Sequence, residues 1–242
     1  DRCTGSIRAC GFGSKTCSPH RRSGCGSDAG GCAGSTEIAM KQQREKWPYA
    51  YAALLPGYEL YEVIDFSKDP KLQKRIAWSG LAVICAMTAA ALPVHTLRSA
   101  ISMPPVQITA AALGTLVGFV VYLFLHEGVH GMCIKFFTGV PAQYGFELRA
   151  GMVYASSRFF FRRTAYMIIA LAPIVVWGIV LPLLLRDIPE QYWWYLYAIQ
   201  IFNVSGAAGD LFVTYRILTM PKDVLVLDTG MEMKFFAPTH FA

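Results

Sequence analysis

The chain has 242 residues, of which 54% are hydrophobic and only 16% are charged. In a soluble globular protein, charged residues interrupt the apolar stretches much more often. The formal net charge of +6 does not require a nucleic acid partner, because basic loops beside anionic lipid account for it. The composition therefore favours a membrane protein.

Residues 1–39 differ from the rest of the chain. They contain no C-x-x-C pair and no apolar periodicity, but hold five of the seven cysteines: Cys3, Cys10, Cys17, Cys25 and Cys32. Disulfides are disfavoured in the cytoplasm, where the charge pattern described below places this segment. We expect residues 1–39 to be a disordered, non-native upstream extension, with the native protein starting at Met40.

Residues 40–75 form a polar cytoplasmic segment with scattered aromatic residues, typical of a short strand or of an interfacial segment near lipid headgroups. Four runs of about 19 to 21 residues without Asp, Glu, Lys or Arg follow. Each has the length and composition of a membrane-spanning helix. These runs are residues 76–94, 106–125, 165–185 and 191–209. We predict an all-α membrane protein with about four transmembrane helices over residues 76–220, followed by a cytoplasmic tail at residues 221–242.

Lys and Arg are distributed unevenly among the connections. They are frequent before the first run, between the second and third runs, and after the fourth, whereas the first connection contains only Arg98 and the third only Arg186. The positive-inside rule places the basic segments in the cytoplasm. We therefore expect a multi-pass protein of the cell membrane with both termini cytoplasmic.

A metal-binding motif follows the second run directly, where residues 126–130 read His-Glu-Gly-Val-His. Residues i and i+4 of a helix lie on one face, so His126 and His130 can bind one metal ion with the Glu127 carboxylate beside it. The alternative is a histidine pair that only packs. We expect the motif to stand at the end of the second transmembrane helix.

The fourth run supplies the candidate for a third ligand. Asp210 lies about 19 residues into this run and His126 about 20 residues into the second, so both reach a similar depth after roughly 30 Å of helix. An acid near membrane depth is costly unless it is paired or bound. Two His, one carboxylate and a water would complete a catalytic zinc site. Alternatively, Asp210 pairs with Arg216 or caps a helix break, which leaves Asp223 and Asp228 as weaker candidates.

Two short strand signals lie outside the predicted helices. Between the second and third runs, larger residues alternate with smaller or polar ones on both sides of Ala150-Gly151, which predicts a β-hairpin at the cytoplasmic surface. Its edge could bind an extended peptide by strand addition, or the hairpin could only close the cytoplasmic mouth. Residues 224–228 predict another short strand in the tail.

Three segments together resemble the site-2 protease superfamily, in particular its small bacterial and archaeal branch of zincin peptidases. They are residues 126–131, Ala172-Pro173 in the third run, and residues 203–210, which read Asn-Val-Ser-Gly-Ala-Ala-Gly-Asp. The resemblance covers about residues 49–236. It implies zinc as the cofactor, with His126, His130 and Asp210 as ligands and Glu127 as the catalytic acid and base.

A protein of this kind would be a zinc metalloendopeptidase that hydrolyses peptide bonds of membrane-associated proteins. Zinc would polarise the carbonyl and lower the pKa of a bound water, and Glu127 would pass the proton of this water to the leaving amine. Asn203 could bind the developing oxyanion or the substrate backbone. The alternative is a non-proteolytic multi-pass protein, a transporter or scaffold with a structural metal site. Glu127 favours the enzyme, because a structural site needs no general base.

Overall fold

The computed structural model describes residues 49–147 and 152–239. These residues belong to one compact unit of the chain, Lys41–Ala242. The cysteine-rich residues 1–39, the expected start at Met40 and the hairpin turn at Ala150-Gly151 lie outside the described residues.

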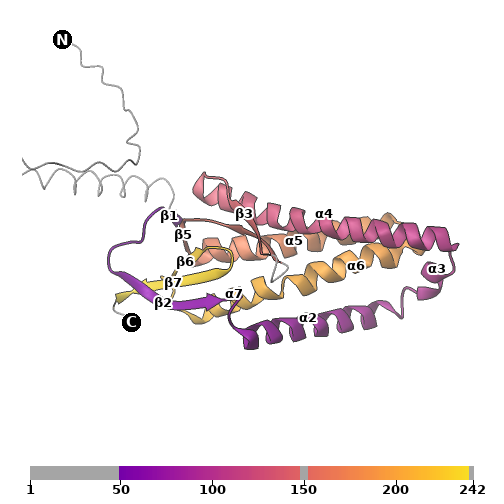
Figure 1. Cartoon of the computed structure of the whole chain (residues 1–242), viewed down its shortest axis with the longest axis horizontal. Coiled ribbons are helices and arrows are strands. Elements are labelled where there is room, and N and C mark those ends of the chain that lie inside the picture. The colour runs from indigo at the N-terminus through magenta and orange to yellow at the C-terminus, as the bar shows by residue number, and fades with distance from the viewer. Residues whose placement is uncertain (1–48, 148–151, 240–242) are drawn as a thin grey trace, which may run out of the picture. The chain divides into compact units, whose positions relative to one another are not determined.

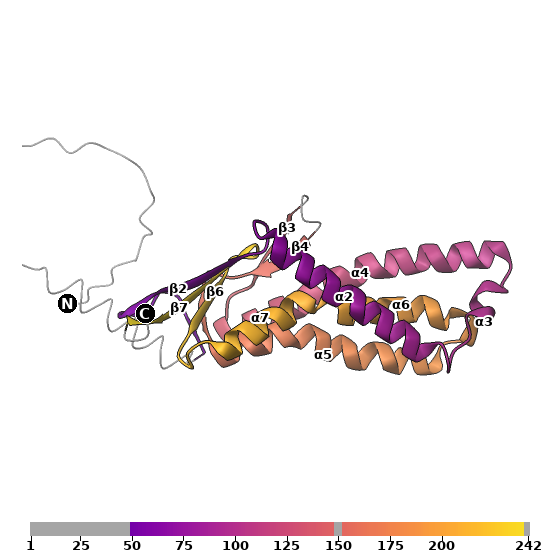
Figure 2. The ribbon, with the colours of Figure 1, turned by 90° about the horizontal axis from the view of Figure 1, so that it is seen from below.

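Most of the described chain is helical, and its long helices lie side by side (Figures 1 and 2). Asp69 and Pro70 set the start of α2. The Asp69 side chain accepts hydrogen bonds from the amides of Lys71 and Leu72. Pro70 suits the first helical position, because no N–H is needed there. Proline precedes or begins α4 and α6 as well. The helices are α2 (Pro70–Ala91), α3 (Leu97–Ile101), α4 (Pro105–Thr138), α5 (Arg163–Asp187), α6 (Glu190–Gly206) and α7 (Ala208–Thr219).

Three helical segments of the described chain are long and apolar enough to cross a membrane: α4, α5, and α6 with α7. They contain the second, third and fourth predicted runs. Helix α2, which contains most of the first run, is not among them: it has 22 residues, but its first turns carry Lys71, Lys74 and Arg75, and it ends at Ala91. Pro93 explains why α2 ends there, because proline has no N–H to continue the hydrogen bonding of the helix.

The metal-binding motif does not end its helix, contrary to our expectation. Helix α4 continues past His130 to Thr138 and ends at Gly139, whose φ of 72° is the left-handed conformation typical of a helix C-terminus. Gly131, directly after the motif, stays within the helix, and Gly139 is the first glycine after the motif with a positive φ. The motif is therefore held within a continuous helix.

A five-stranded antiparallel sheet lies at the end of the helices opposite to α3 (Figures 1 and 2). Its strand order is β1-β5-β6-β7-β2, so β2 from the N-terminal segment pairs with β7 from the tail. The expectation of an all-α fold is incomplete for this reason, although β6 confirms the strand predicted at residues 224–228. The strands are β1 (Ala50–Tyr51), β2 (Tyr58–Asp65), β5 (Phe160–Arg162), β6 (Leu225–Asp228) and β7 (Glu232–Pro238).

The predicted hairpin is confirmed as a separate two-stranded sheet. Strand β3 (Gln143–Glu147) pairs antiparallel with β4 (Met152–Ser156). In this register Tyr144 lies opposite Ala155 and Phe146 lies opposite Val153. These four side chains share one face of the hairpin, because cross-strand partners point to the same side.

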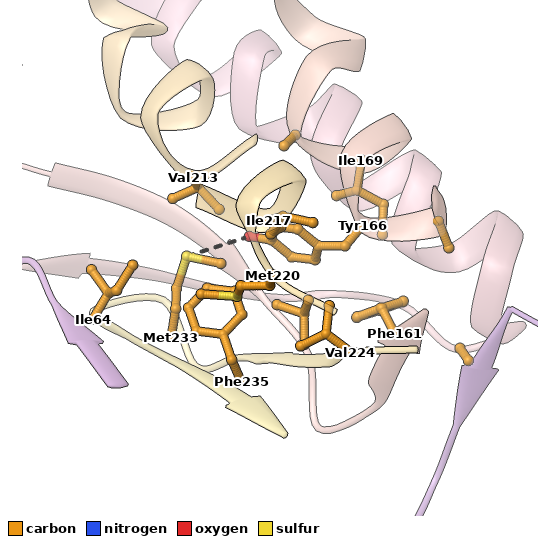
Figure 3. Close-up of a cluster of buried hydrophobic side chains, with 14 of the residues drawn as sticks. Ile64, Phe161, Tyr166, Ile169, Val213, Ile217, Met220, Val224, Met233 and Phe235 are labelled. Atoms are coloured by element: carbon orange, nitrogen blue, oxygen red, sulfur yellow. Dashed lines mark hydrogen bonds between the residues drawn. The ribbon is translucent and has the colours of Figure 1, made fainter. Parts of the chain in front are cut away.

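A buried apolar cluster fixes the large sheet to the helices (Figure 3). Phe161, Val226 and Phe235 come from three neighbouring strands, and each is 0% exposed. They pack in one cluster with Tyr166 of α5 and Ile217 of α7. Burying each large apolar side chain contributes about 1.5 to 3 kcal/mol, so the sheet holds these ends of α5 and α7 in place.

Candidate metal centre

The structure brings His126, His130 and Asp210 together. His126 Nε2 lies 3.5 Å from Asp210 Oδ2, and His130 Nε2 lies 3.7 Å from Asp210 Oδ1. The candidate ligand atoms of the three residues lie within 4.8 Å of one another. A chain segment from α4 and another from α7 therefore supply one His/His/carboxylate group.

A helix break positions Asp210. Helix α6 ends at Gly206, α7 begins at Ala208, and Asp210 stands in the first turn of α7. Arg216 does not pair with it, because the Arg216 guanidinium binds both carboxylate oxygens of Glu62 in β2 at 2.7 and 2.6 Å. The Asp210 carboxylate is thus left for the two imidazoles.

His126 is oriented by a tyrosine one turn earlier on α4. His126 Nδ1 lies 2.9 Å from Tyr122 Oη, and the Tyr122 hydroxyl donates to Asn203 Oδ1 at 3.0 Å. A tyrosine hydroxyl has a single proton, so the hydrogen between His126 and Tyr122 comes from Nδ1. This tautomer leaves Nε2 of His126 with a free lone pair that faces Asp210.

His130 is oriented by a backbone carbonyl of α5. Its Nδ1 lies 2.8 Å from the carbonyl oxygen of Ile169, which can only accept. Within α5 this carbonyl would normally accept from the amide four residues later, but that residue is Pro173, which has no N–H. The proline thus leaves the Ile169 carbonyl available to His130, and Nε2 of His130 again faces Asp210.

The geometry fits a zinc ion. Bonds of about 2.0 to 2.2 Å in a tetrahedral site place neighbouring ligand atoms about 3.3 to 3.6 Å apart, close to the two His–Asp separations. Each imidazole donates from Nδ1 to a fixed partner, the arrangement that metal-binding histidines usually show. Two His and one carboxylate leave a fourth position, as in catalytic zinc sites.

Glu127 and two of the candidate ligands, His130 and Asp210, line a cavity of about 400 Å³. The cavity is bounded by α2, the hairpin strand β4 and the turn between β6 and β7, in addition to α4, α5 and α7. Glu127 approaches the backbone of Ala155 in β4. A substrate in this cavity would therefore meet Glu127, His130, Asp210 and one strand of the hairpin together.

Asp228 and Tyr166 form a second polar pair in this cavity. The Tyr166 hydroxyl donates to Asp228 Oδ2 at 2.5 Å, and the Gly230 amide donates to Oδ1 at 2.8 Å. Burial raises the pKa of Asp228, although both hydrogen bonds oppose this. Asp228 does not belong to the metal-binding group formed by the described residues, and Asp223 is exposed.

Asn203 lies on the far side of His126 from the cavity. Its side chain is 0% exposed, and it is not among the residues that line the cavity. This position supports Tyr122 and His126, a role that the sequence analysis did not assign. Tyr122 itself was missed, although its spacing of four residues from His126 places it on the same helical face.

The comparison with protein families concerns this part of the chain. Residues 119–225 match a family described as "Putative zincin peptidase", a stretch that contains Glu127 and all three candidate ligands. Over this stretch the chain resembles zincin peptidases. A protein of Pyrococcus woesei, named "Uncharacterized 24.7 kDa protein in gap 5'region", is 30% identical over 120 residues, which are 48% of this chain and 51% of that protein.

The chain thus spans about half the length of the curated relative that it matches. No solved structure matches it. The family match supports a zincin-like peptidase and implies zinc as the metal. The His/His/Asp group described above could hold this ion.

Proposed function

We propose that the chain is a membrane-embedded zinc metalloendopeptidase that hydrolyses peptide bonds of membrane-associated proteins. The position of Glu127 carries this proposal, because its side chain lines the same cavity as His130 and Asp210. A structural metal site is closed and requires no acid beside the ligands. A catalytic site needs both an open position and a general base.

The side chains divide the chemistry among them. His126, His130 and Asp210 would hold a zinc ion, which would supply a Lewis acid for the peptide carbonyl and for a water molecule. Glu127 accepts a proton from this water as the water oxygen attacks the carbonyl carbon. It then gives the proton to the amine nitrogen as the C–N bond breaks. Glu127 is ionised again at the end of the reaction.

The hairpin offers a binding surface for the substrate backbone. Among the described residues, β4 pairs with β3 on one side only, and Val153, Tyr154 and Ala155 of β4 line the catalytic cavity. An extended segment added to the free edge of β4 would lie beside Glu127. This explains how a substrate that is helical in the membrane could be held unwound for cleavage.

The membrane arrangement is part of the proposal. The apolar side chains of α4 are widely exposed, among them Val117 and Phe124, which suits a lipid environment. We propose that α2 crosses the membrane as a fourth helix, with both termini and the hairpin in the cytoplasm of a multi-pass cell membrane protein. The basic residues that precede α2 support this orientation.

The test compares the zinc-loaded wild type with Glu127→Gln, a variant that keeps the shape of the side chain but cannot act as a base. Each purified protein is incubated in detergent with solubilised membrane proteins, and new amino termini are labelled and mapped by mass spectrometry. We expect the wild type to generate new termini and Glu127→Gln to generate almost none.

Two results would contradict the proposal. Cleavage by Glu127→Gln at the wild-type rate would show that the activity does not belong to this site. A zinc-loaded wild type that cuts nothing would favour the alternative, a transporter or scaffold with a structural metal site.

A further inference from the structure

A second cavity, of about 950 Å³, lies between α4 and the hairpin. Among its lining residues Glu127 is the only charged one, and Gly128 and Gly145 contribute no side chain. The volume lies at the upper end of the range for ligand-binding pockets. The remaining walls are apolar or aromatic: Val120, Leu123, Phe124, Tyr144, Phe146 and Val153.

This second cavity adjoins the catalytic cavity, and the two share part of their lining. Glu127 and Val153 line both of them. Glu127 comes from α4 and Val153 comes from the middle of β4. The side chain of the proposed general base therefore separates the metal centre from the apolar groove, and a group bound in the groove lies directly beside the reacting bond.

The hairpin register explains which parts of a substrate would enter the groove. Tyr144, Phe146 and Val153 share one face of the hairpin, and this face lines the groove. On the opposite face, Tyr154 covers Gly145 and Gly230, since a Cβ on either glycine would overlap its ring. A strand added to β4 alternates its side chains between these two faces, so one side chain beside the cut would point into the groove.

The hairpin wall of the groove exposes large aromatic side chains outside the proposed membrane region. On the hairpin side, which we place in the cytoplasm, Tyr144 is 59% exposed and Phe146 58%, and exposed apolar patches of this kind mark binding sites. We propose that the groove is the specificity subsite of the proposed peptidase and receives a large apolar side chain of the substrate next to the scissile bond. This inference rests on the proposed function and names the class of sequence that the site cuts.

Gly128 allows the groove to be filled without a clash. No heavy atom lies within 4 Å of the position that a Cβ on Gly128 would take, and leucine favours a helix more than glycine does. Gly114 stands on the same helix with equally open surroundings, and it does not line the groove. Gly128→Leu is therefore the test variant, and Gly114→Leu is its matched control.

The experiment maps the residues on both sides of every cut in the pool of solubilised membrane proteins, for the wild type and both variants with their zinc content verified. We expect the wild type to cut beside Leu, Ile, Met or Phe. Filling the groove should reduce cleavage at these sites at least about tenfold relative to sites with Ala, Gly or Ser, since single methylene groups already discriminate by such factors. Gly114→Leu should keep the wild-type profile.

An unchanged profile in Gly128→Leu would overturn the inference while the peptidase proposal stands. A wild type without an apolar preference beside the cut would do the same. If zinc-loaded wild type cuts nothing, the proposed function fails and the inference fails with it. Should Gly128→Leu not fold, Phe146→Ala widens the groove from the hairpin side, and the share of aromatic residues beside the cut must then rise.

Discussion

The two imidazoles of the metal centre depend on different kinds of partner. His126 donates to a side-chain hydroxyl, that of Tyr122, which a substitution can remove. His130 donates to the backbone carbonyl of Ile169, which no substitution removes directly. The orientation of each ring can therefore be tested separately. For His126 the partner side chain is substituted, and for His130 the helix that carries the carbonyl is altered.

Tyr122→Phe should lower the affinity for zinc about 10- to 100-fold, the usual effect of losing the partner of a metal-binding histidine. The ring remains, so its packing against Trp177 should be retained. The affinity is measured in detergent by competition with a chelator. Tyr197→Phe is the control, because the Tyr197 hydroxyl binds the Met87 carbonyl and has no contact with the metal centre. Equal affinities for the two variants would contradict the role of Tyr122.

The sequence was enough to predict the three candidate ligands of the centre, but not how the neighbouring side chains are arranged around them. The spacing of His126 and His130 and the depth of Asp210 were enough to propose that the three meet, and the structure places them together. The sequence placed Asn203 near the same region, but it could not show on which side of His126 the amide lies. That depends on how α6 rotates against α4, which no local pattern records.

Helix α5 contributes a backbone carbonyl to the centre, and this carbonyl has no hydrogen-bond partner within its own helix. An ordinary residue at position 173 would bind the Ile169 carbonyl within the helix, whereas proline leaves this carbonyl to His130. In the sequence alone, the Ala172-Pro173 pair is only part of a resemblance. The structure gives it a physical role at the level of the helix.

Pro173→Ala should reduce zinc affinity about tenfold, because the new amide competes with His130 for the Ile169 carbonyl. The variant should not lose thermal stability, since alanine is far better tolerated than proline inside a helix. Pro182→Ala, in the same helix but outside the metal centre, should leave the zinc affinity at the wild-type value. The role of Pro173 fails if its variant binds zinc as tightly as Pro182→Ala does.

The elements that could be predicted are those with a local pattern. The apolar runs gave α4, α5 and the α6–α7 segment, and alternation gave the hairpin. The five-stranded sheet was only partly visible, because β2 and β7 come from opposite ends of the described chain and β1 and β5 have two and three residues. Pairing between such distant or short strands has no signature in a sequence window.

For the molecule as a whole, the orientation in the membrane depends on whether α2 crosses it. Ser67 precedes α2 and Thr96 follows it, and both are exposed. If α2 crosses, the two residues lie on opposite sides of the membrane, with Ser67 in the cytoplasm by the positive-inside rule.

In a variant whose seven cysteines are replaced by serine, Thr96→Cys should react with a membrane-impermeant maleimide in intact cells. Ser67→Cys should react only after the cells are opened. Labelling of both positions under the same condition would show that α2 does not cross, and the chain would then have three spans.

The zinc content of the purified protein tests the account most directly. It is measured per chain by elemental analysis, in detergent, for the wild type, Glu127→Gln, His126→Ala and Asp210→Ala. We expect about one zinc in the wild type and in Glu127→Gln, and almost none in the two variants that lack a ligand. A wild type without zinc would contradict the account, and full zinc in Asp210→Ala would show that the third ligand is another residue.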